Sequence, residues 1–500
     1  MMESNPGRIT LHPEDNVEVA VDSDDPMRGH KFALIDITGG QSIIKLGERI
    51  GRASTDITTG EHVHTHNVSP DRQPITAAEA GTNVEDTSRR AAVSTSVDAG
   101  ALPSTFEGYR RADGRVGTRN HLLVLTSVNC SASVARVIAR TARDRGLDQA
   151  RNIDGITALT HHGGCGIGVE TDGMANLRRT LAGYLTHANV AGVVIVGLGC
   201  EANQIDALLD DRGLEHGDRL KTLVIQDEGG SQATVERGVE LLAELAETAA
   251  ADRRSPVDVS NLVLALQCGG SDGYSAITAN PALGRASDLL VAAGGTVILG
   301  ETPEMHGAEH LLVRRAVSTD VAQELLDRLA WWRRHSEPED NPTPGNKRGG
   351  LTTIAEKSLG AIAKAGSSPL VDVLGYAEPV NPARPGFVIM DSPGYDPCSV
   401  TGEIASGANL VCFTTGRGSV SGFAPAPSLK VATNTPLFEK MPGDIDLNAG
   451  TIVGGGESVD EVGARLFQLL VDTAAGATTA SERLGFGEEE FVPWQMGVVT

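Results

Sequence analysis

Three histidines alternate along a short stretch near the start of the chain, GEHVHTHNV at residues 60–68, where His62, His64 and His66 occupy every second position. In an extended strand alternate side chains point to the same face, so the imidazoles would form one row with neighbours roughly 6–7 Å apart. Two of them could share a metal ion where the strand twists, whereas three in a straight strand could not easily do so. We therefore expect ligand or base roles for His62 and His64, and less from His66.

Polar, Gly-rich stretches follow the ends of the predicted strands in the rest of the chain. They are TSVNCSAS, THHGGCGIG, GLGCEANQ, QCGGSDGYSAITANP, GETPEMHGAEH, DSPGYDPCSVTGE and TTGRGSVSGF. In open parallel sheets, ligands bind beyond the carboxyl ends of the strands. One such loop would mean little, but six or more at successive strands predict a composite active site. Arg115, Arg119 and Arg417 lie in Gly-flanked loops, where a guanidinium group could grip a carboxylate.

Cys165 has the best claim to function among the cysteines. It lies between two glycines, four residues after His161, and a thiolate with an imidazole could bind a soft divalent metal such as Fe(II). A structural role for this thiol is equally compatible with the sequence. For Cys130 and Cys412 we expect ordinary buried packing. GLGCE lacks the signatures of a dinucleotide loop and of a serine hydrolase, and TTGRGS lacks the lysine and spacing of a P-loop.

The elements that must position these groups fall into separate blocks. Short strand-like runs, NVEVAVD, HKFALIDI and SIIKLG, predict a small β-rich domain over residues 1–70. Residues 71–105 are polar and non-periodic, which indicates a linker. Apolar strands alternate with amphipathic helices over 106–340 and again over 346–500, on either side of the Pro-rich stretch SEPEDNPTPGNKRGG. This alternation predicts two α/β domains with mainly parallel sheets, of which the C-terminal one is Rossmann-like.

Composition limits the class of protein. A chain of 500 residues is too long for a single core, and a net charge of −23 argues against nucleic acid as a partner. The six cysteines are scattered without a C-x-x-C pair, which fits a reducing compartment better than a disulfide framework. The N-terminus lacks an apolar signal core and no run approaches the length of a membrane span. We therefore expect a cytoplasmic protein without membrane contact.

Several long motifs closely resemble those of the altronate/galactarate dehydratase family. They are GYRRADGRVGTRN (108–120), CGGSDGYSAITANPALG (268–284), GETPEMHGAE (300–309) and DSPGYDPCSVTGEIASGANLVCFTTGRGS (391–419). HPEDNVEVAV (12–21) and GEHVHTHN (60–67) resemble the N-terminal SAF-type domain of that family. The resemblance covers nearly the whole chain except the expected linker.

The resemblance implies elimination of water from a sugar acid to give a 2-keto-3-deoxy acid, with altronate as the first expectation and galactarate as an alternative. It also implies a divalent metal, first Fe(II), with Mn(II) or Mg(II) as alternatives, and we expect a homo-oligomer. A family branch that eliminates sulfite from sulfolactate is a further enzymatic alternative, and a sugar-acid-binding sensor is a non-enzymatic one. Leu46 and Ala424 depart from residues that are frequent in the family, which leaves the named substrate open.

Abstraction of the proton next to a carboxylate requires a stabilised dianion, a base of near-neutral pKa and an acid for the leaving hydroxyl. Our hypothesis is that the small domain closes a cleft formed by the other two. The expected catalytic residues are Lys45, His64, His161, Asp391 and Asp396. The expected substrate-binding residues are Arg115, Arg119, Ser271, Asp272, Arg417 and Ser419, and the expected metal ligands are His62, His64, Cys165 and Glu201.

Overall fold

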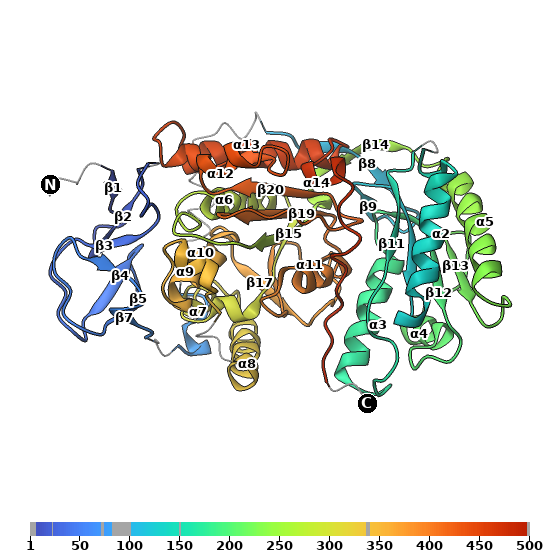
Figure 1. Ribbon diagram of the computed structural model, residues 1–500, viewed down its shortest axis with the longest axis horizontal. Coiled ribbons are helices and arrows are strands. Elements are labelled where there is room, and N and C mark those ends of the chain that lie inside the picture. The colour runs from blue at the N-terminus through green and yellow to red at the C-terminus, as the bar shows by residue number, and fades with distance from the viewer. Residues whose placement is uncertain are drawn as a thin grey trace.

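The protein consists of a small N-terminal module, a seven-stranded sheet and a four-stranded sheet, each with its own surrounding elements. The computed structural model describes residues 7–22, 24–71, 75–82, 102–149, 152–336 and 341–497. Figure 1 shows the N-terminal module at one end of the long axis and the four-stranded sheet at the other, with the seven-stranded sheet between them.

The N-terminal module contains two small antiparallel sheets, with strand orders β1-β2-β3-β6 and β4-β5-β7. Buried aliphatic side chains such as Val17, Ile43, Ile50 and Val63 fill its core, so the predicted β-rich domain is confirmed. Its strands are β1 (Arg8–Ile9), β2 (Val17–Ala20), β3 (Lys31–Ala33), β4 (Ser42–Lys45), β5 (Glu48–Ala53), β6 (His62–Val63) and β7 (Val68–Ser69). Much of the expected linker, residues 72–74 and 83–101, lies outside the described residues, and the part between holds the 3-10 helix η1 (Ala77–Glu79).

The four-stranded sheet is parallel, with the order β11-β10-β12-β13 and helices on both faces. Because it is formed by the middle of the sequence, we call it with its helices the middle part. Leu122 and Val124 of β10 share a core with α2 and α5, whereas Leu123 and Leu125 share one with α3 and α4. Coverage of both faces explains why every residue of β12 is buried. The elements are β10 (His121–Thr126), η3 (Asn129–Ser131), α2 (Ala132–Asp144), η4 (Leu147–Gln149), β11 (Gly155–Leu159), α3 (Asp172–Leu185), β12 (Val190–Gly197), α4 (Ile205–Arg212), β13 (Leu220–Val224) and α5 (Ser231–Ala249).

A seven-stranded parallel sheet of order β17-β18-β16-β15-β19-β20-β21 forms the centre of the molecule. Its strands are β15 (Val263–Cys268), β16 (Thr296–Leu299), β17 (Leu370–Leu374), β18 (Phe387–Met390), β19 (Leu410–Thr415), β20 (Ser428–Ala432) and β21 (Leu447–Asn448). A small antiparallel sheet of β8 (Thr105–Arg110), β9 (Val116–Gly117) and β14 (Arg254–Asp258) joins it to the middle part, followed by η5 (Val259–Asn261). Because β15 and β16 pair with later strands, this sheet crosses the boundary that we expected between 340 and 346.

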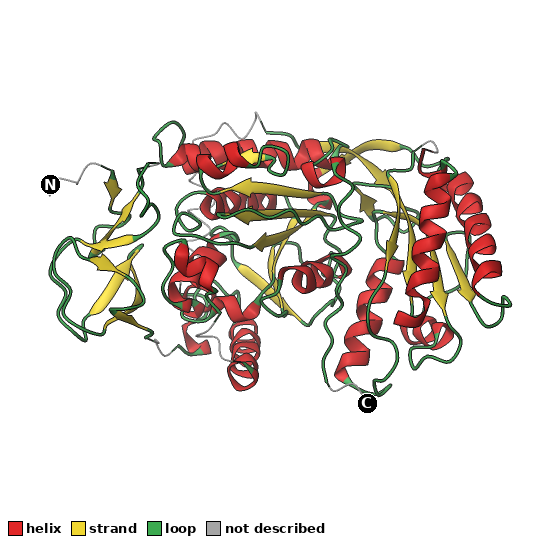
Figure 2. Ribbon diagram, viewed as in Figure 1, coloured by secondary structure: helices red, strands yellow, loops and turns green. Residues whose placement is uncertain are grey.

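Helices cover both faces of the central sheet, as Figure 2 shows. Helices α6, α8, α10 and α13 share one core with the sheet, and α11 shares the other with α3 of the middle part. The predicted α/β class with mainly parallel sheets is confirmed. The helices are α6 (Ala279–Ala292), η6 (Thr302–Met305), α7 (Glu309–Val313), α8 (Thr319–His335), α9 (Pro344–Arg348), α10 (Ile354–Ala363), α11 (Asp396–Ala405), α12 (Thr435–Lys440), η8 (Gly450–Ile452), α13 (Val459–Ala474) and α14 (Ala480–Arg483). Among the described residues, every helix is too short or too polar to cross a lipid bilayer.

Candidate active site

The loops after β15 and β19 meet where the strand order of the central sheet reverses. β15 has β16 on one side and β19 on the other. The chain runs from β15 through β16, β17 and β18 on one side before it returns to β19. Such a switch point leaves a crevice beyond the carboxyl ends of the strands, where open parallel sheets commonly bind ligands.

A thiol and two carboxylates, which we call the donor group, lie together at this end of the sheet. Cys268 ends β15, and Glu301 and Glu304 follow β16. Their ligand atoms lie within 4.8 Å of one another, and all three side chains are buried. Lys364 Nζ lies 3.1 Å from the sulfur of Cys268 and 3.7 Å from Oε2 of Glu301. Lys357 Nζ of α10 lies 2.6 Å from Oε1 of Glu304. Two ammonium groups therefore lie beside the thiol and the two carboxyl groups.

Glu301 adopts a left-handed backbone conformation, with φ of +62°. A non-glycine residue there costs on the order of 1–3 kcal/mol, which the surrounding structure must offset. Ser392 Oγ accepts a 2.7 Å hydrogen bond from the backbone nitrogen of Glu301. Asp391, at the end of β18, accepts hydrogen bonds of 2.7 Å from Thr302 Oγ1 and Trp332 Nε1. Asp391 thus holds η6 in place instead of joining the donor group.

Asp396 is the first residue of α11 and lies close to the donor group. Its Oδ1 accepts a 2.7 Å hydrogen bond from Gln267 Nε2. Burial raises the pKa of Asp396 to about 6, although the hydrogen bond from Gln267 acts in the opposite direction. A carboxyl group whose pKa lies near neutrality can both accept and release a proton.

Burial also changes the protonation of the donor group itself. It raises the pKa of the Cys268 thiol to about 11, and it raises the pKa of Glu301 well above the usual range, with the charge of Glu304 adding to the shift. Burial opposes the charge of Lys364, but Cys268 and Glu301 outweigh it and raise the pKa of that lysine. A cation in the group would favour thiolate and carboxylate instead, so ion binding here is linked to proton release.

The donor group fits a divalent cation. Oε2 of Glu301, Oε2 of Glu304 and Oε1 of Gln267 are buried, and among the described residues they find no hydrogen-bond partner. Buried polar atoms without partners cost free energy, and a cation between the two carboxylates would satisfy them. Cys268, Glu301 and Glu304 are therefore the residues that could hold a metal.

Asp272 connects the loop after β15 with the segment that follows β20. Its carboxylate accepts hydrogen bonds from Thr433 Oγ1 at 3.1 Å, Asn434 Nδ2 at 3.2 Å and Ser275 Oγ at 3.2 Å. Burial raises the pKa of Asp272 to about 6 against these hydrogen bonds. Because its oxygens are already occupied, Asp272 serves best to fix the shape of the crevice.

Arg417 adds a positively charged side chain to the same group of loops. It is exposed, and a Cβ built on Gly270 would lie 3.5 Å from the Cβ of Arg417. Ser271 is buried, and its carbonyl oxygen accepts a 3.0 Å hydrogen bond from Asn346 Nδ2. Ser419 is half-buried two residues beyond Arg417. The structure therefore brings Ser271, Asp272 and Arg417 into neighbouring loops at the switch point.

The histidines of the N-terminal module form a cluster beside these loops. Strand β6 ends at Val63, so a turn and not a long strand gathers the rings, and His30 joins them. The rings of His62 and His64 lie 5.2 Å apart, and His30 Nδ1 lies 3.0 Å from His62 Nε2. Burial and the neighbouring imidazoles lower the pKa of His62 to about 4, so this ring is neutral at pH 7.

The segment after α9 lies between the histidine cluster and Asp272. His64 Nε2 donates a 2.9 Å hydrogen bond to the carbonyl oxygen of Lys347, and His30 Nε2 lies 3.3 Å from that of Arg348. A Cβ on Gly349 would lie 2.9 Å from the Cβ of Asp272. The backbone of residues 347–349 thus lies between the imidazoles and Asp272.

Lys45 lies in a buried ion-pair network, which also contains Lys31. Lys31 Nζ and Lys45 Nζ each lie 2.8 Å from a carboxylate oxygen of Glu356 in α10. Burial on its own would raise the pKa of Glu356, but the two ammonium groups outweigh it and lower that pKa. Glu356 immediately precedes Lys357, which contacts Glu304. Helix α10 therefore links the N-terminal module to the donor group.

Comparison with known proteins places the whole chain in one family. Residues 23–71 match the altronate/galactarate dehydratase SAF domain, residues 108–250 the second domain of D-galactarate dehydratase/altronate hydrolase, and residues 259–499 the C-terminal domain of D-galactarate/altronate dehydratase. The altronate dehydratase of Bacillus subtilis (strain 168) is 36% identical, over 96% of this chain and 97% of that protein. The galactarate dehydratase (L-threo-forming) of Escherichia coli (strain K12) is 36% identical, over 90% of this chain and 86% of that protein. The (2R)-sulfolactate sulfo-lyase subunit beta of Chromohalobacter salexigens is 35% identical, over 77% of this chain and 96% of that protein.

The chain belongs to the altronate/galactarate dehydratase family. The relatives that match this chain over most of its length include altronate and galactarate dehydratases, which are hydro-lyases, so the expected enzyme class is confirmed. Similarity at the same identity to altronate and galactarate dehydratases leaves the individual sugar acid open.

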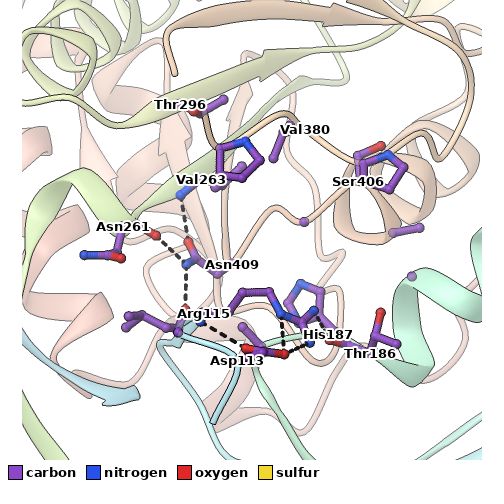
Figure 3. Close-up of a pocket in the computed structure, with 18 of the residues that line it drawn as sticks. Asp113, Arg115, Thr186, His187, Asn261, Val263, Thr296, Val380, Ser406 and Asn409 are labelled. Carbon is purple, nitrogen blue, oxygen red and sulfur yellow. Dashed lines mark hydrogen bonds and ion pairs between the residues drawn. The ribbon is translucent and has the colours of Figure 1, made fainter. Parts of the chain in front are cut away.

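Two arginines that we expected to bind substrate lie elsewhere in this dehydratase-family protein. Figure 3 shows Arg115 with Asp113 at a cavity of about 890 Å³, whose lining also includes Asn261 and Asn409. These asparagines precede β15 and β19, so the cavity lies at the amino ends of the strands, opposite the donor group. Arg119 is buried and forms a bidentate ion pair with Glu482, at 2.6 and 3.0 Å, which joins two parts of the fold.

His161, Cys165 and Glu201 lie at the carboxyl edge of the four-stranded sheet, apart from His62 and His64 in the N-terminal module. His161 is buried, with Nε2 2.9 Å from the carbonyl oxygen of Thr126 and Nδ1 accepting from the backbone of Gly163. Glu201 accepts hydrogen bonds of 2.7 Å from Ser127 Oγ and from the backbone of Gly199. The four expected metal ligands thus belong to two separate regions.

The two cysteines that we expected to pack in the core have different outcomes. Cys412 is buried as expected, but Cys130 is exposed, because it lies in η3 at the sheet edge.

Proposed function

We propose that the protein removes water from a sugar acid, with altronate as the first candidate, and produces a 2-keto-3-deoxy acid. The observation that carries this proposal is the buried donor group of Cys268, Glu301 and Glu304 beside Asp396, at the switch point of the central sheet. Similarity to dehydratases over nearly the whole chain supports it.

We infer that the donor group holds a divalent cation, with Fe(II) as the first candidate and Mn(II) or Mg(II) as alternatives. One thiol among two carboxylates favours a softer ion such as Fe(II) over Mg(II). When bound, the cation supplies electrostatic stabilisation for negative charge that develops on the substrate.

Asp396 is the proposed proton carrier. Its carboxylate takes the proton from the carbon next to the substrate carboxylate and passes it to the hydroxyl on the following carbon, which departs as water. The enol that remains becomes the 2-keto acid by tautomerisation. Arg417, exposed beside the crevice, is placed to attract the substrate carboxylate. Lys45 and His64 support the site through Glu356 and the Lys347 carbonyl.

The proposal is tested with purified protein under anaerobic conditions. Altronate, galactarate and related hexonates and hexarates are supplied with Fe(II), Mn(II) or Mg(II), and 2-keto-3-deoxy acid is measured. We expect turnover of altronate above the others, and formation of no 2-keto acid from any sugar acid with any metal would contradict the proposal.

Sulfolactate is the second candidate substrate, because the sulfo-lyase subunit of C. salexigens is 35% identical over 77% of this chain. Sulfite release from sulfolactate without dehydration of sugar acids would favour it.

The free cysteines fit a reducing, cytoplasmic location. We also infer a homo-oligomer, which sedimentation of the purified protein would check.

A further inference from the structure

Three exposed cysteines lie at the carboxyl edge of the four-stranded sheet. Cys130 follows β10, Cys165 follows β11 and Cys200 follows β12, and all three are exposed while the other three cysteines are buried. The order β11-β10-β12-β13 makes these three strands direct neighbours, with β10 in the middle. The chain leaves β10 for one side and then crosses to the other, so this edge is a second switch point.

Hydrogen bonds join the three loops that carry these thiols. The backbone nitrogen of Asn129 donates to the carbonyl oxygen of Gly163 at 3.0 Å, and that of Asn203 donates to Gly164 at 3.0 Å. Asn203 Nδ2 donates to the carbonyl oxygen of Ser127 at 3.1 Å. Gly164 has φ of +94°, and a Cβ there would overlap the Ser127 carbonyl oxygen, so the loops around Cys130 and Cys165 touch through backbone. The thiols therefore come from one connected layer.

The other ligand-type groups in this layer already have partners. Both oxygens of Glu201 accept hydrogen bonds from the loops, and both ring nitrogens of His161 are engaged. Among the described residues, the group with ligand atoms close enough for a single ion is the one around Cys268, not this one. The sulfur atoms of the three cysteines lie further apart than the ligand atoms of a single metal ion do. Three such thiols on one edge fit a cluster in which each thiolate binds a different iron.

We propose that Cys130, Cys165 and Cys200 hold a [4Fe–4S] cluster. Iron–sulfur clusters are held by cysteine thiolates, and three cysteines leave one iron for a ligand other than cysteine. The inference does not rest on the dehydratase activity, because the thiols lie on a different sheet from the donor group. Glu201 and Asn203 are then positioning residues that hold the cysteine-bearing loops.

Anaerobic reconstitution tests the cluster. Full-length protein is incubated with ferrous iron, sulfide and a thiol reductant and then desalted. We expect about four acid-labile sulfide ions per chain and four iron ions beyond any iron held by the donor group, with visible absorption that bleaches on reduction. Cys130→Ser, Cys165→Ser and Cys200→Ser should each lose most of the sulfide and the absorption, and their exposed positions predict unchanged thermal unfolding of the cluster-free protein.

Cys398→Ser and Cys268→Ser are the matched controls and should keep the full cluster, since both cysteines are buried in the central part. Absence of acid-labile sulfide from the reconstituted protein, zinc retained by the three thiols in preference to iron, or a cluster that survives the triple serine variant would overturn the proposal. An active hydro-lyase without a cluster would leave the proposed function intact, and a cluster in an inactive protein would leave this inference intact.

Discussion

At the scale of single residues, the donor group combines one sulfur and two oxygen ligands, and the sulfur sets its preference for metals. We predict that Cys268→Ser weakens binding of Fe(II) by roughly tenfold or more, because loss of even an outer partner of a metal site commonly costs about 10–100-fold. Anaerobic titration of Fe(II) into the metal-free protein measures the effect. Cys398→Ser, also buried, is the control and should bind as the wild type does. Equal Fe(II) affinity in both variants would remove Cys268 from the site.

Asp396 differs from its neighbours because its role requires a change of charge. Asp396→Asn keeps the shape and removes the proton acceptor, so we predict a fall in kcat of about 10²–10⁴-fold with metal binding preserved. Since burial raises the pKa of Asp396, the base gains a proton as the pH falls into the acidic range, and wild-type kcat should decline there. A pH profile of kcat for both proteins provides the check. If Asp396→Asn lowered metal content in parallel with kcat, the residue would be a ligand instead.

At the scale of elements, α10 connects the N-terminal module to the donor group through one buried carboxylate. Glu356→Gln would leave the ammonium groups of Lys31 and Lys45 buried without a counter-charge. Breaking such a network by removing one partner costs about 3–5 kcal/mol. We predict a loss of stability of that order, with faster amide exchange in β2 and β3, measured by denaturant unfolding and hydrogen exchange. Glu79→Gln, which removes a partly exposed ion pair with Arg314, should cost about 0–1 kcal/mol.

The same network makes the docking of the module sensitive to acid. The pKa of Glu356 is lower in the folded protein than in the unfolded chain. Its contribution to stability is therefore complete above the ordinary carboxyl pKa of about 4.3, and it is lost as pH falls toward the folded value. The wild type should lose stability over that acidic range more steeply than Glu356→Gln, and parallel curves for the two proteins would show that the carboxylate does not control docking.

The elements also explain what the sequence could predict. Strand-end loops carry Ser271, Asp272 and Asp396 to one edge because parallel strands all end there, and this follows from the alternation of strands and helices. Lys357, Lys364 and Glu356 could not be found in this way, since charged residues on a helix normally face solvent. Helix α10 is buried because β5 of the module, η6 and α6 all pack against it, and such tertiary contacts leave no trace in local periodicity.

The same limit applies to the histidines and to the domain boundary. Alternation along the chain identified His62 and His64, but His30 joins them from another strand, so spacing could not reveal it. Apolar runs predicted β15 and β16 as strands but carried no information about which strands pair with them. Strands β15 and β16, which precede the Pro-rich stretch, therefore belong to the central sheet, whereas we expected a domain division near residue 340.

At the scale of the whole molecule, the module and the catalytic loops must meet closely enough for backbone to touch backbone. A Cβ on Gly273 would overlap the carbonyl oxygen of Gly29, next to Asp272 and His30. We predict that Gly273→Ala costs about 1–3 kcal/mol, as overpacking does, and displaces the module. Turnover should fall while Fe(II) binding at the donor group persists, because the ligands lie on the sheet side of the contact.

Steady-state kinetics, Fe(II) titration and hydrogen exchange of β3 and β6 on one preparation separate the possible results. Gly217→Ala is the matched control, since a Cβ there meets no atom within 4 Å, and it should behave as the wild type does. If Gly273→Ala displaced the module yet retained full turnover, the histidine cluster would have no part in the reaction. Loss of both turnover and Fe(II) binding would mean instead that the module holds the donor group together. The contacts for this exist, because Lys45 pairs with Glu356 in α10 and the next residue, Lys357, pairs with Glu304.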